Sequence, residues 1–372
     1  MLSDSIYKGA RSLSVMLTYA CPAACKDCGT VSSPNDKNHV DLPTVLSAID
    51  QAAGLQFANV VFTGGEATLR WDDLLASIRH AAGKGLKTRL VTNAHWATSP
   101  EESLKYVRLL IDAGLDELNF STGDEHIRFI PLEHVAYATA AALTQPISVS
   151  VMIELRAERQ VNKEKFLSHP VIQSLPAEVV GRVNIFESPW MPLSPSRREQ
   201  YPEGMAVDAK NVHVKKGCDS VLQTYVLAGD GRVAACCGLG MRLIKELNVG
   251  QARGEDFLAR AVEDSESDFF KVLLHYRGPE KILAWAASKN PEIKWEGMYA
   301  HKCQACLRLY QDPAVREVVK QHYTELYAST IQAIWLEEEF IPAEMSRHGL
   351  AGKACYPEAQ QEAETEAEMV AG

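Results

Sequence analysis

The sequence lacks any long hydrophobic run. No stretch approaches the ~18 uncharged apolar residues that a transmembrane helix needs, and the N-terminus has no signal-peptide core. The chain also lacks a long basic run, and 48 acidic against 38 basic residues give a net charge of −10. Because nucleic-acid backbones bind clustered Lys and Arg, this balance disfavours nucleic acid as a partner. We therefore expect a cytoplasmic protein that does not bind membranes.

The cysteines do not look like a disulfide set. There are nine of them, an odd number, and seven fall into three local groups. Reduced thiolates that bind metal fit this distribution better. The remaining composition, 46% hydrophobic and 23% charged residues over 372 positions, is that of a globular protein long enough for one large α/β domain and a smaller one.

The first cysteine group is Cys21, Cys25 and Cys28, spaced C-x3-C-x2-C directly after an apolar run. One loop with three thiolates can hold three corners of an iron-sulfur cube and leave the fourth iron open for a small molecule. Two alternatives remain at this point. The group could be a zinc knuckle with a fourth ligand such as His39, or a set of unrelated free thiols.

This motif resembles the signature of the radical S-adenosylmethionine (SAM) superfamily, in which it follows the first strand of a barrel. The resemblance continues at Gly64-Gly65-Glu66, which follows a second apolar strand and is similar to the turn that holds the amino group of SAM in relatives. One departure is visible, because relatives usually have an aromatic residue before the third cysteine and this chain has Asp27.

Strand and helix patterns alternate downstream, which predicts right-handed βαβ units and a parallel sheet. The expected strands are 12–18, 59–62, 88–91, 117–121, 147–153 and 183–186, and the expected helices are 41–54, 71–85, 102–113 and 132–143. Six units are too few for a closed eight-stranded barrel. They match the open, partial (β/α)6 TIM-like barrel of radical SAM enzymes, whose site lies at the carboxyl ends of the strands.

Several polar residues follow the expected strands. The resemblance implies SAM contacts at strand ends, which points to Asn93, Ser121, Asp124, Glu154 and Arg156 in addition to Gly64, Gly65 and Glu66. His126 lies in the same dense polar group and is a candidate to contact substrate or move a proton. Ordinary polarity at loop positions is the alternative for each of these residues.

A second cysteine set follows the barrel, where we expect the parallel pattern to stop after about Pro192. Residues 224–227 and 233–236, joined by a Gly-Asp-Gly turn, predict a β-hairpin. The spacing of Cys218, Cys236, Cys303 and Cys306 resembles the short auxiliary-cluster module known as the twitch domain, a small α+β domain with one [4Fe-4S] cluster. A zinc site on the same four cysteines is the alternative.

Cys237 has no assigned partner. It could replace Cys236 as the ligand, or be a free thiol close to the cluster, whereas Cys355 is an incidental thiol. The predicted organisation is a leader at 1–11, a barrel at 12–210, a twitch domain at 211–312, a helical extension at 313–356 and an acidic, disordered tail at 357–372. The short leader leaves no room for the peptide-binding domain that some relatives carry before the cysteine motif.

The resemblance implies two [4Fe-4S] clusters, SAM cleavage to a 5′-deoxyadenosyl radical, and an electron donor such as flavodoxin or ferredoxin. The substrate would be a small molecule or a short peptide. Oxidation, cross-linking or rearrangement is one expected outcome for the substrate radical. Inversion of a stereocentre, with Cys237 as the hydrogen donor, is another, and an iron-sulfur carrier or sensor without catalysis is a third.

Overall fold

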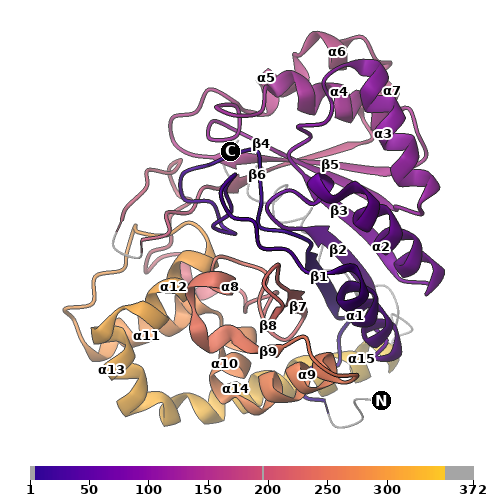
Figure 1. Ribbon diagram of the computed structural model, residues 1–372. Coiled ribbons are helices and arrows are strands. Elements are labelled where there is room, and N and C mark those ends of the chain that lie inside the picture. Colours follow the sequence, from indigo (N-terminus) through magenta and orange to yellow (C-terminus); the bar gives the residue numbers. More distant parts are fainter. Residues whose placement is uncertain (1–4, 195–196, 348–372) are drawn as a thin grey trace.

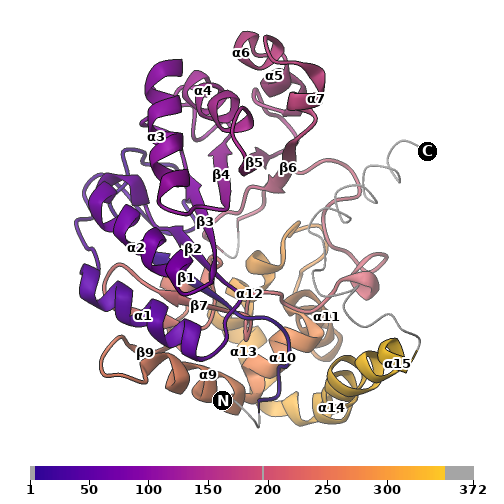
Figure 2. The ribbon, with the colours of Figure 1, turned by 90° about the vertical axis from the view of Figure 1, so that its right-hand side faces the viewer.

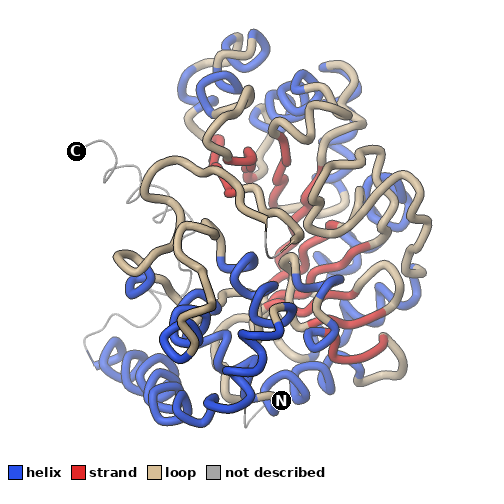
Figure 3. Tube along the Cα trace, turned by 90° about the vertical axis from the view of Figure 1, so that its left-hand side faces the viewer, coloured by secondary structure: helices blue, strands red, loops and turns tan. Residues whose placement is uncertain are grey.

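The computed structural model describes residues 5–194 and 197–347. Its framework is one nine-stranded sheet with the order β6-β5-β4-β3-β2-β1-β7-β8-β9 (Figure 1). The strands are β1 (Ser12–Met16), β2 (Asn59–Thr63), β3 (Lys87–Thr92), β4 (Glu117–Thr122), β5 (Ser148–Leu155), β6 (Val183–Pro189), β7 (Thr224–Leu227), β8 (Arg232–Ala234) and β9 (Asn248–Gln251). In Figure 3 they form a continuous curved row.

The first six strands pair in parallel in chain order, which confirms the predicted partial barrel. The main crossover helices are α1 (Leu42–Gly54), α2 (Trp71–Gly83), α3 (Pro100–Asp112) and α4 (Leu132–Leu143). They cover one face of the sheet (Figure 2), and the largest apolar core lies between the two layers. A short 3-10 helix, η1 (Ala67–Arg70), follows the Gly-Gly-Glu turn.

Local sequence signals set the helix starts. The Asp41 carboxylate accepts a hydrogen bond from the Thr44 backbone N–H at 2.8 Å at the start of α1, and Ser99 caps α3 in the same way. Helices α1 and α3 each have a proline in the first turn, where no backbone N–H is needed. The crossover after β5 instead contains three short helices, α5 (Lys163–Leu167), α6 (Pro170–Gln173) and α7 (Ala177–Val180).

The predicted hairpin is present as β7 and β8, but the expectation that parallel pairing stops after Pro192 was wrong. Strand β7 pairs in parallel with β1, from Ser12 opposite Thr224 to Val15 opposite Leu227. Strand β1 would otherwise be an open sheet edge with unpaired backbone groups, and β7 satisfies them. The antiparallel strands β8 and β9 then extend the same sheet. The second cysteine set is thus tied directly to the barrel.

The helices after the hairpin form a second packed body around their own apolar core. They are α8 (Gly240–Leu243), η3 (Lys245–Leu247), α9 (Phe257–Ser267), α10 (Phe269–Arg277), α11 (Pro279–Lys289), α12 (Lys302–Gln311), α13 (Pro313–His322), η4 (Tyr323–Leu326), α14 (Tyr327–Trp335), η5 (Leu336–Phe340) and α15 (Ile341–Arg347), with η2 (Val212–Val214) before the hairpin. The predicted acidic tail and Cys355 lie outside the described residues. No helix in the described ranges is long and apolar enough to cross a membrane.

Candidate active site and cysteine clusters

The first three cysteines lie in the loop after β1. The Cys21 sulfur accepts hydrogen bonds from the Ala23 backbone N–H at 3.4 Å and from Asn93 Nδ2 at 3.5 Å, while the Cys25 thiol lies 3.7 Å from the Glu125 carbonyl oxygen. Burial raises the pKa of Cys21 and Cys25 to about 12, and the nearby Cys28 sulfur adds to both shifts. The three thiols therefore lie close together, and a bound metal would be needed to keep Cys21 and Cys25 ionised.

Asp27, the departure from the usual aromatic residue, fixes the shape of this loop. It has a positive φ of 57°, which a short polar side chain tolerates better than a bulky one. Its carboxylate accepts hydrogen bonds from the Leu193 backbone N–H at 3.2 Å and from Arg197 Nη1 at 2.8 Å. Asp27 thus ties the cysteine loop to the segment that follows β6.

The Gly-Gly-Glu turn packs against the chain that leads into Cys21. A Cβ at Gly64, whose φ is 143°, would lie 2.5 Å from the Thr18 carbonyl oxygen, and one at Gly65 would lie 2.2 Å from that of Ala20. The backbone N–H groups of Gly65 and Glu66 donate to these two oxygens at 2.7 and 2.8 Å. The close approach that the glycines permit is therefore to the cysteine loop itself, while contact of the turn with SAM stays a prediction.

The Glu66 carboxylate is buried and forms a dense network. Its Oε1 accepts hydrogen bonds from both the backbone N–H and the hydroxyl of Thr68, and from the Thr92 hydroxyl at 2.8 Å. Its Oε2 accepts one from the Asn93 backbone N–H at 2.9 Å. This leaves about one acceptor position, on Oε2, for an external ammonium group. Glu66 therefore joins the ends of β2 and β3, and its predicted role toward SAM rests on that single position.

The ends of β4 and β5 bring Glu154 and His126 together. Glu154 is only 3% exposed, and its Oε1 accepts a hydrogen bond from the Glu125 backbone N–H at 2.7 Å. Its Oε2 has no hydrogen-bond partner and lies 3.6 Å from the equally unpartnered His126 Nδ1. Gly123 makes room for this carboxylate, because a Cβ there would lie 2.0 Å from Glu154 Cγ. Ser121 is buried beside this group, at the end of β4.

Arg156 completes the same polar group. Its guanidinium lies 3.4 Å from Glu125 Oε1 and 3.9 Å from Glu154 Oε1, and stacks over the Trp190 ring at 5.3 Å. Asp124 lies apart, because its carboxylate accepts hydrogen bonds from the backbone N–H groups of Gln160 and Val161. Of the residues predicted at these strand ends, Asp124 thus holds a loop in place, while the others gather next to the cysteine loop.

The second cysteine set also comes together, from segments up to 88 residues apart, from Cys218 to Cys306. Burial raises the pKa of all four thiols, that of Cys218 to about 11. The nearby Cys236, Cys218 and Cys303 raise the pKa of Cys306 further. A Cβ at Gly238 would lie 2.6 Å from Cys303 Sγ, and the Gly238 backbone N–H donates to Cys236 Sγ at 3.2 Å. Gly238 therefore forms part of the cradle for these sulfurs.

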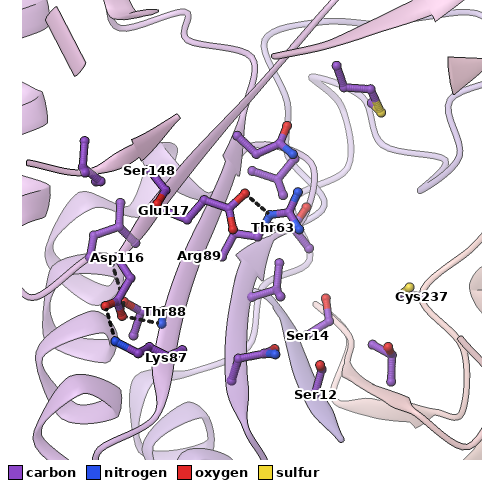
Figure 4. Close-up of a pocket in the computed structure, with 18 of the residues that line it drawn as sticks. Ser12, Ser14, Thr63, Lys87, Thr88, Arg89, Asp116, Glu117, Ser148 and Cys237 are labelled. Atoms are coloured by element: carbon purple, nitrogen blue, oxygen red, sulfur yellow. Dashed lines mark hydrogen bonds and ion pairs between the residues drawn. The ribbon is translucent and has the colours of Figure 1, made fainter. Parts of the chain in front are cut away.

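Cys237 lies next to that set, close enough to raise the pKa of Cys236 and Cys303. It lines a cavity of about 1530 Å³ inside the barrel, together with inward-facing residues of β1 to β5 such as Ser12 and Ser14 (Figure 4). Its backbone N–H donates to Ser220 Oγ at 3.0 Å, and the two side chains are 3.2 Å apart. Burial of the sulfur raises the pKa of the Cys237 thiol.

All eight cysteines in the described ranges are free thiols. In the same part of the chain, no group of three or more His, Cys, Asp or Glu side chains is arranged to hold a single metal ion. A cubane spreads its cysteine ligands over separate irons, so it accepts thiols that are farther apart than the ligands of one zinc ion. His39, the proposed fourth zinc ligand, is exposed and its Nδ1 lies 3.2 Å from the Lys37 carbonyl oxygen.

Sequence reasoning missed four residues that shape the site: Thr68, Thr92, Glu125 and Trp190. Thr92 and Glu125 directly adjoin residues that were predicted, and their positions at strand ends were the available signal. Trp190 lies just beyond β6 and gave no such signal, because its contact with Arg156 depends on how β5 and β6 end side by side.

Residues 15–124 match the family model of the radical SAM superfamily. No curated protein sequence matches the chain. Among solved structures, native anSMEcpe with bound AdoMet aligns with a TM-score of 0.53 at 12% identity, over 87% of this chain and 99% of that one.

Two further structures are more distant. BtrN in complex with AdoMet and 2-DOIA has a TM-score of 0.43 at 14% identity, over 72% of this chain and 88% of that one. SuiB of Streptococcus suis bound to S-adenosylmethionine has a TM-score of 0.39 at 13% identity, over 68% and 65%. The matched residues 15–124 include the cysteine motif and the Gly-Gly-Glu turn, so the similarity to the radical SAM superfamily lies in this part of the chain.

Proposed function

We propose that the chain is a radical SAM oxidoreductase or maturase that acts on a small molecule or a short peptide. The observation that carries this proposal is the convergence of three thiols with Asn93, Glu125 and the Gly-Gly-Glu turn at one end of the barrel. Bound there, a [4Fe-4S] cluster and SAM would supply a 5′-deoxyadenosyl radical that takes a hydrogen atom from an unactivated C–H bond.

The residues around the loop would bind and orient SAM. Cys21, Cys25 and Cys28 would hold three irons, and Asn93 Nδ2 would stabilise the Cys21 thiolate by its hydrogen bond. The unpartnered oxygen of Glu154 and the cationic Arg156 would face the ribose and carboxylate groups. His126, 3.6 Å from that oxygen, would contact the substrate or hold a proton beside it.

Cys218, Cys236, Cys303 and Cys306 would hold the auxiliary cluster. The orientation of Cys237 into the cavity supports Cys236 as the ligand of the two. A cluster at this position would supply a one-electron acceptor beside the barrel, which favours oxidation of the substrate. The reducing cytosol, where free thiols persist, is the compartment that fits these cysteines, with flavodoxin or ferredoxin as the electron donor.

The second candidate function is epimerisation, favoured by the same orientation of Cys237. Its thiol would transfer one hydrogen atom to the substrate radical and become a thiyl radical, which then needs one electron from the donor protein and one proton from solvent. A thiol that lines the cavity is placed for this step, whereas one packed under the hairpin would not be. Oxidation remains the function that we favour.

Reduced, anaerobically reconstituted protein incubated with SAM should release 5′-deoxyadenosine, measured by liquid chromatography and mass spectrometry. The triple variant C21A/C25A/C28A is the control and should release none. Equal release by both proteins, or none by the wild type, would overturn the assignment as an enzyme and leave the carrier or sensor function.

A further inference from the structure

The barrel cavity has a polar side that the proposed SAM site does not use. Inward-facing residues at the starts of the strands are polar, and strand pairing arranges them in two rows. Ser12, Asn59 and Lys87 form the first row, and Arg89, Glu117 and Ser148 form the second. The lining is more apolar toward the strand ends, at Met16, Val91, Met152 and Phe186. The cavity wall therefore changes from polar to more apolar along the barrel axis.

Two amide side chains on the cavity wall lack hydrogen-bond partners, one in the first row and one a row beyond the second, opposite Val91. Asn119, on β4, is 3% exposed and lines the cavity, and its buried Oδ1 accepts no hydrogen bond. Asn59, on β2, also lines the cavity, and its buried Oδ1 likewise accepts no hydrogen bond. A buried polar group without a partner destabilises a protein, so such groups are usually paired or used. Two of them on the wall of one cavity indicate a ligand that donates hydrogen bonds.

The charges in this region are already paired. Arg89 Nε lies 3.2 Å from Glu117 Oε1, and Lys87 Nζ lies 2.9 Å from Asp116 Oδ1 (Figure 4). Arg182, the remaining basic residue of the lining, donates to the carbonyl oxygens of Leu143 and Gln145 at 2.9 Å. A phosphate or another anion would have to compete with Asp116 and Glu117 for Lys87 and Arg89. The wall therefore suits a polar ligand without net charge.

We propose that Asn59, Arg89, Glu117 and Asn119 form a subsite that binds the polar, uncharged end of the substrate, a group rich in hydroxyls. This inference rests on the proposed function, because it places the reacting carbon at the apolar end of the cavity, toward the cysteine loop. Hydroxyl groups would donate to the two amide oxygens and accept from the Arg89 guanidinium. The substrate class is thus a neutral, hydroxyl-rich small molecule.

The first test is thermal stability. Asn119→Leu should raise the Tm by about 2–4 °C, because it removes an unpaired buried amide whose role is to bind a ligand. Thr139→Val is the matched control: the Thr139 hydroxyl is also buried without a partner, but it lies in α4 away from the cavity. It should raise the Tm in the same way. A lower Tm for Asn119→Leu alone would mean that Asn119 supports the fold, and would overturn the proposal.

The second test is binding, measured on protein without SAM so that it does not depend on SAM cleavage. In saturation-transfer NMR, millimolar myo-inositol should give a signal with the wild type and with Thr139→Val, and a signal at least fivefold weaker with Asn119→Leu. Glucose 6-phosphate should give none. No myo-inositol signal with the wild type, an equal signal with Asn119→Leu, or stronger binding of the phosphorylated sugar would each overturn the subsite. Failure of SAM cleavage would overturn only the proposed function and leave this binding result standing.

Discussion

His126 Nδ1 and Glu154 Oε2 lie 3.6 Å apart at the ends of β4 and β5, and neither atom has a hydrogen-bond partner. Both are buried, and the carboxylate is 3% exposed. Buried polar atoms left open next to a cysteine loop are typical of a site that is completed by a ligand. The position of the Glu154 carboxylate depends on Gly123, whose missing side chain leaves space for it.

Gly123→Ala should therefore displace Glu154. The new Cβ would meet Glu154 Cγ at 2.0 Å, and the φ of 140° at this position is itself strained for Ala. We expect a loss of about 1–3 kcal/mol in the free energy of unfolding and weaker SAM binding, measured by chemical denaturation and calorimetry. Gly181→Ala is the control, because a Cβ there lies no closer than 3.4 Å to another atom and should change neither quantity.

The two cysteine sets should load with iron independently. Reconstituted wild type should hold about eight irons per chain, as two cubes of four, and C21A/C25A/C28A about four. Iron and sulfide analysis with Mössbauer spectroscopy checks both numbers. Zinc in place of iron at the second set, in protein prepared anaerobically, would contradict the auxiliary cluster.

Glu66→Gln should weaken SAM binding by about tenfold or more if the carboxylate binds the ammonium group. The structure adds a second expectation. The Glu66 carboxylate accepts hydrogen bonds from four donors. In Glu66→Gln the amide NH2 would replace one accepting oxygen and face an existing donor. The free energy of unfolding should therefore fall by about 1–3 kcal/mol.

The stability and the SAM affinity of this variant together separate the roles of Glu66. Lower stability with unchanged SAM affinity would leave it a purely structural role. Normal iron content in the variant is the control, because Glu66 contacts none of the cysteine side chains through these bonds.

Cys237→Ala distinguishes oxidation from epimerisation. If oxidation is the function, the product should be two hydrogens lighter than the substrate and the variant should stay active. If Cys237 donates hydrogen, the variant should still release 5′-deoxyadenosine but form no inverted product. Wild-type turnover in deuterated water should then place one deuterium on the product carbon, because thiol hydrogens exchange with solvent. Mass spectrometry reads all three results.

Glu280→Gln should stabilise the protein at neutral pH. Burial raises the pKa of Glu280, and its Oε2 has no hydrogen-bond partner. A raised folded-state pKa means that the neutral carboxyl contributes stability below the unfolded-state pKa of about 4.5, and that this stability is lost as pH rises through the folded-state value.

The Tm difference between Glu280→Gln and wild type should thus be largest at pH 7–8 and shrink toward pH 5. Glu292→Gln, at an exposed residue, should show no pH-dependent difference. A constant difference for Glu280→Gln across this range would contradict the assigned cause.

Features of this protein that depend on local spacing could be predicted from the sequence. The cysteine motif at Cys21, the helix caps at Asp41 and the alternation of strands and helices through β6 are all local patterns, and each was readable before the fold was known. Periodicity over ten to fifteen residues reports which side of an element is buried, so the parallel sheet followed from it, and the resemblance to radical SAM enzymes implied the partial barrel. Residues at strand ends could be named for the same reason.

Tertiary structure alone decided how distant segments meet. No local pattern indicates that β7 pairs with β1 across more than 200 residues, that Asp27 holds the segment after β6, or that Glu66 is surrounded by donors from β3. The same holds for Cys236 and Cys237, because only the packing decides that Cys236 lies beside Cys306 and that Cys237 lines the cavity. Long-range pairing depends on the sum of many weak contacts, which spacing within one segment does not report.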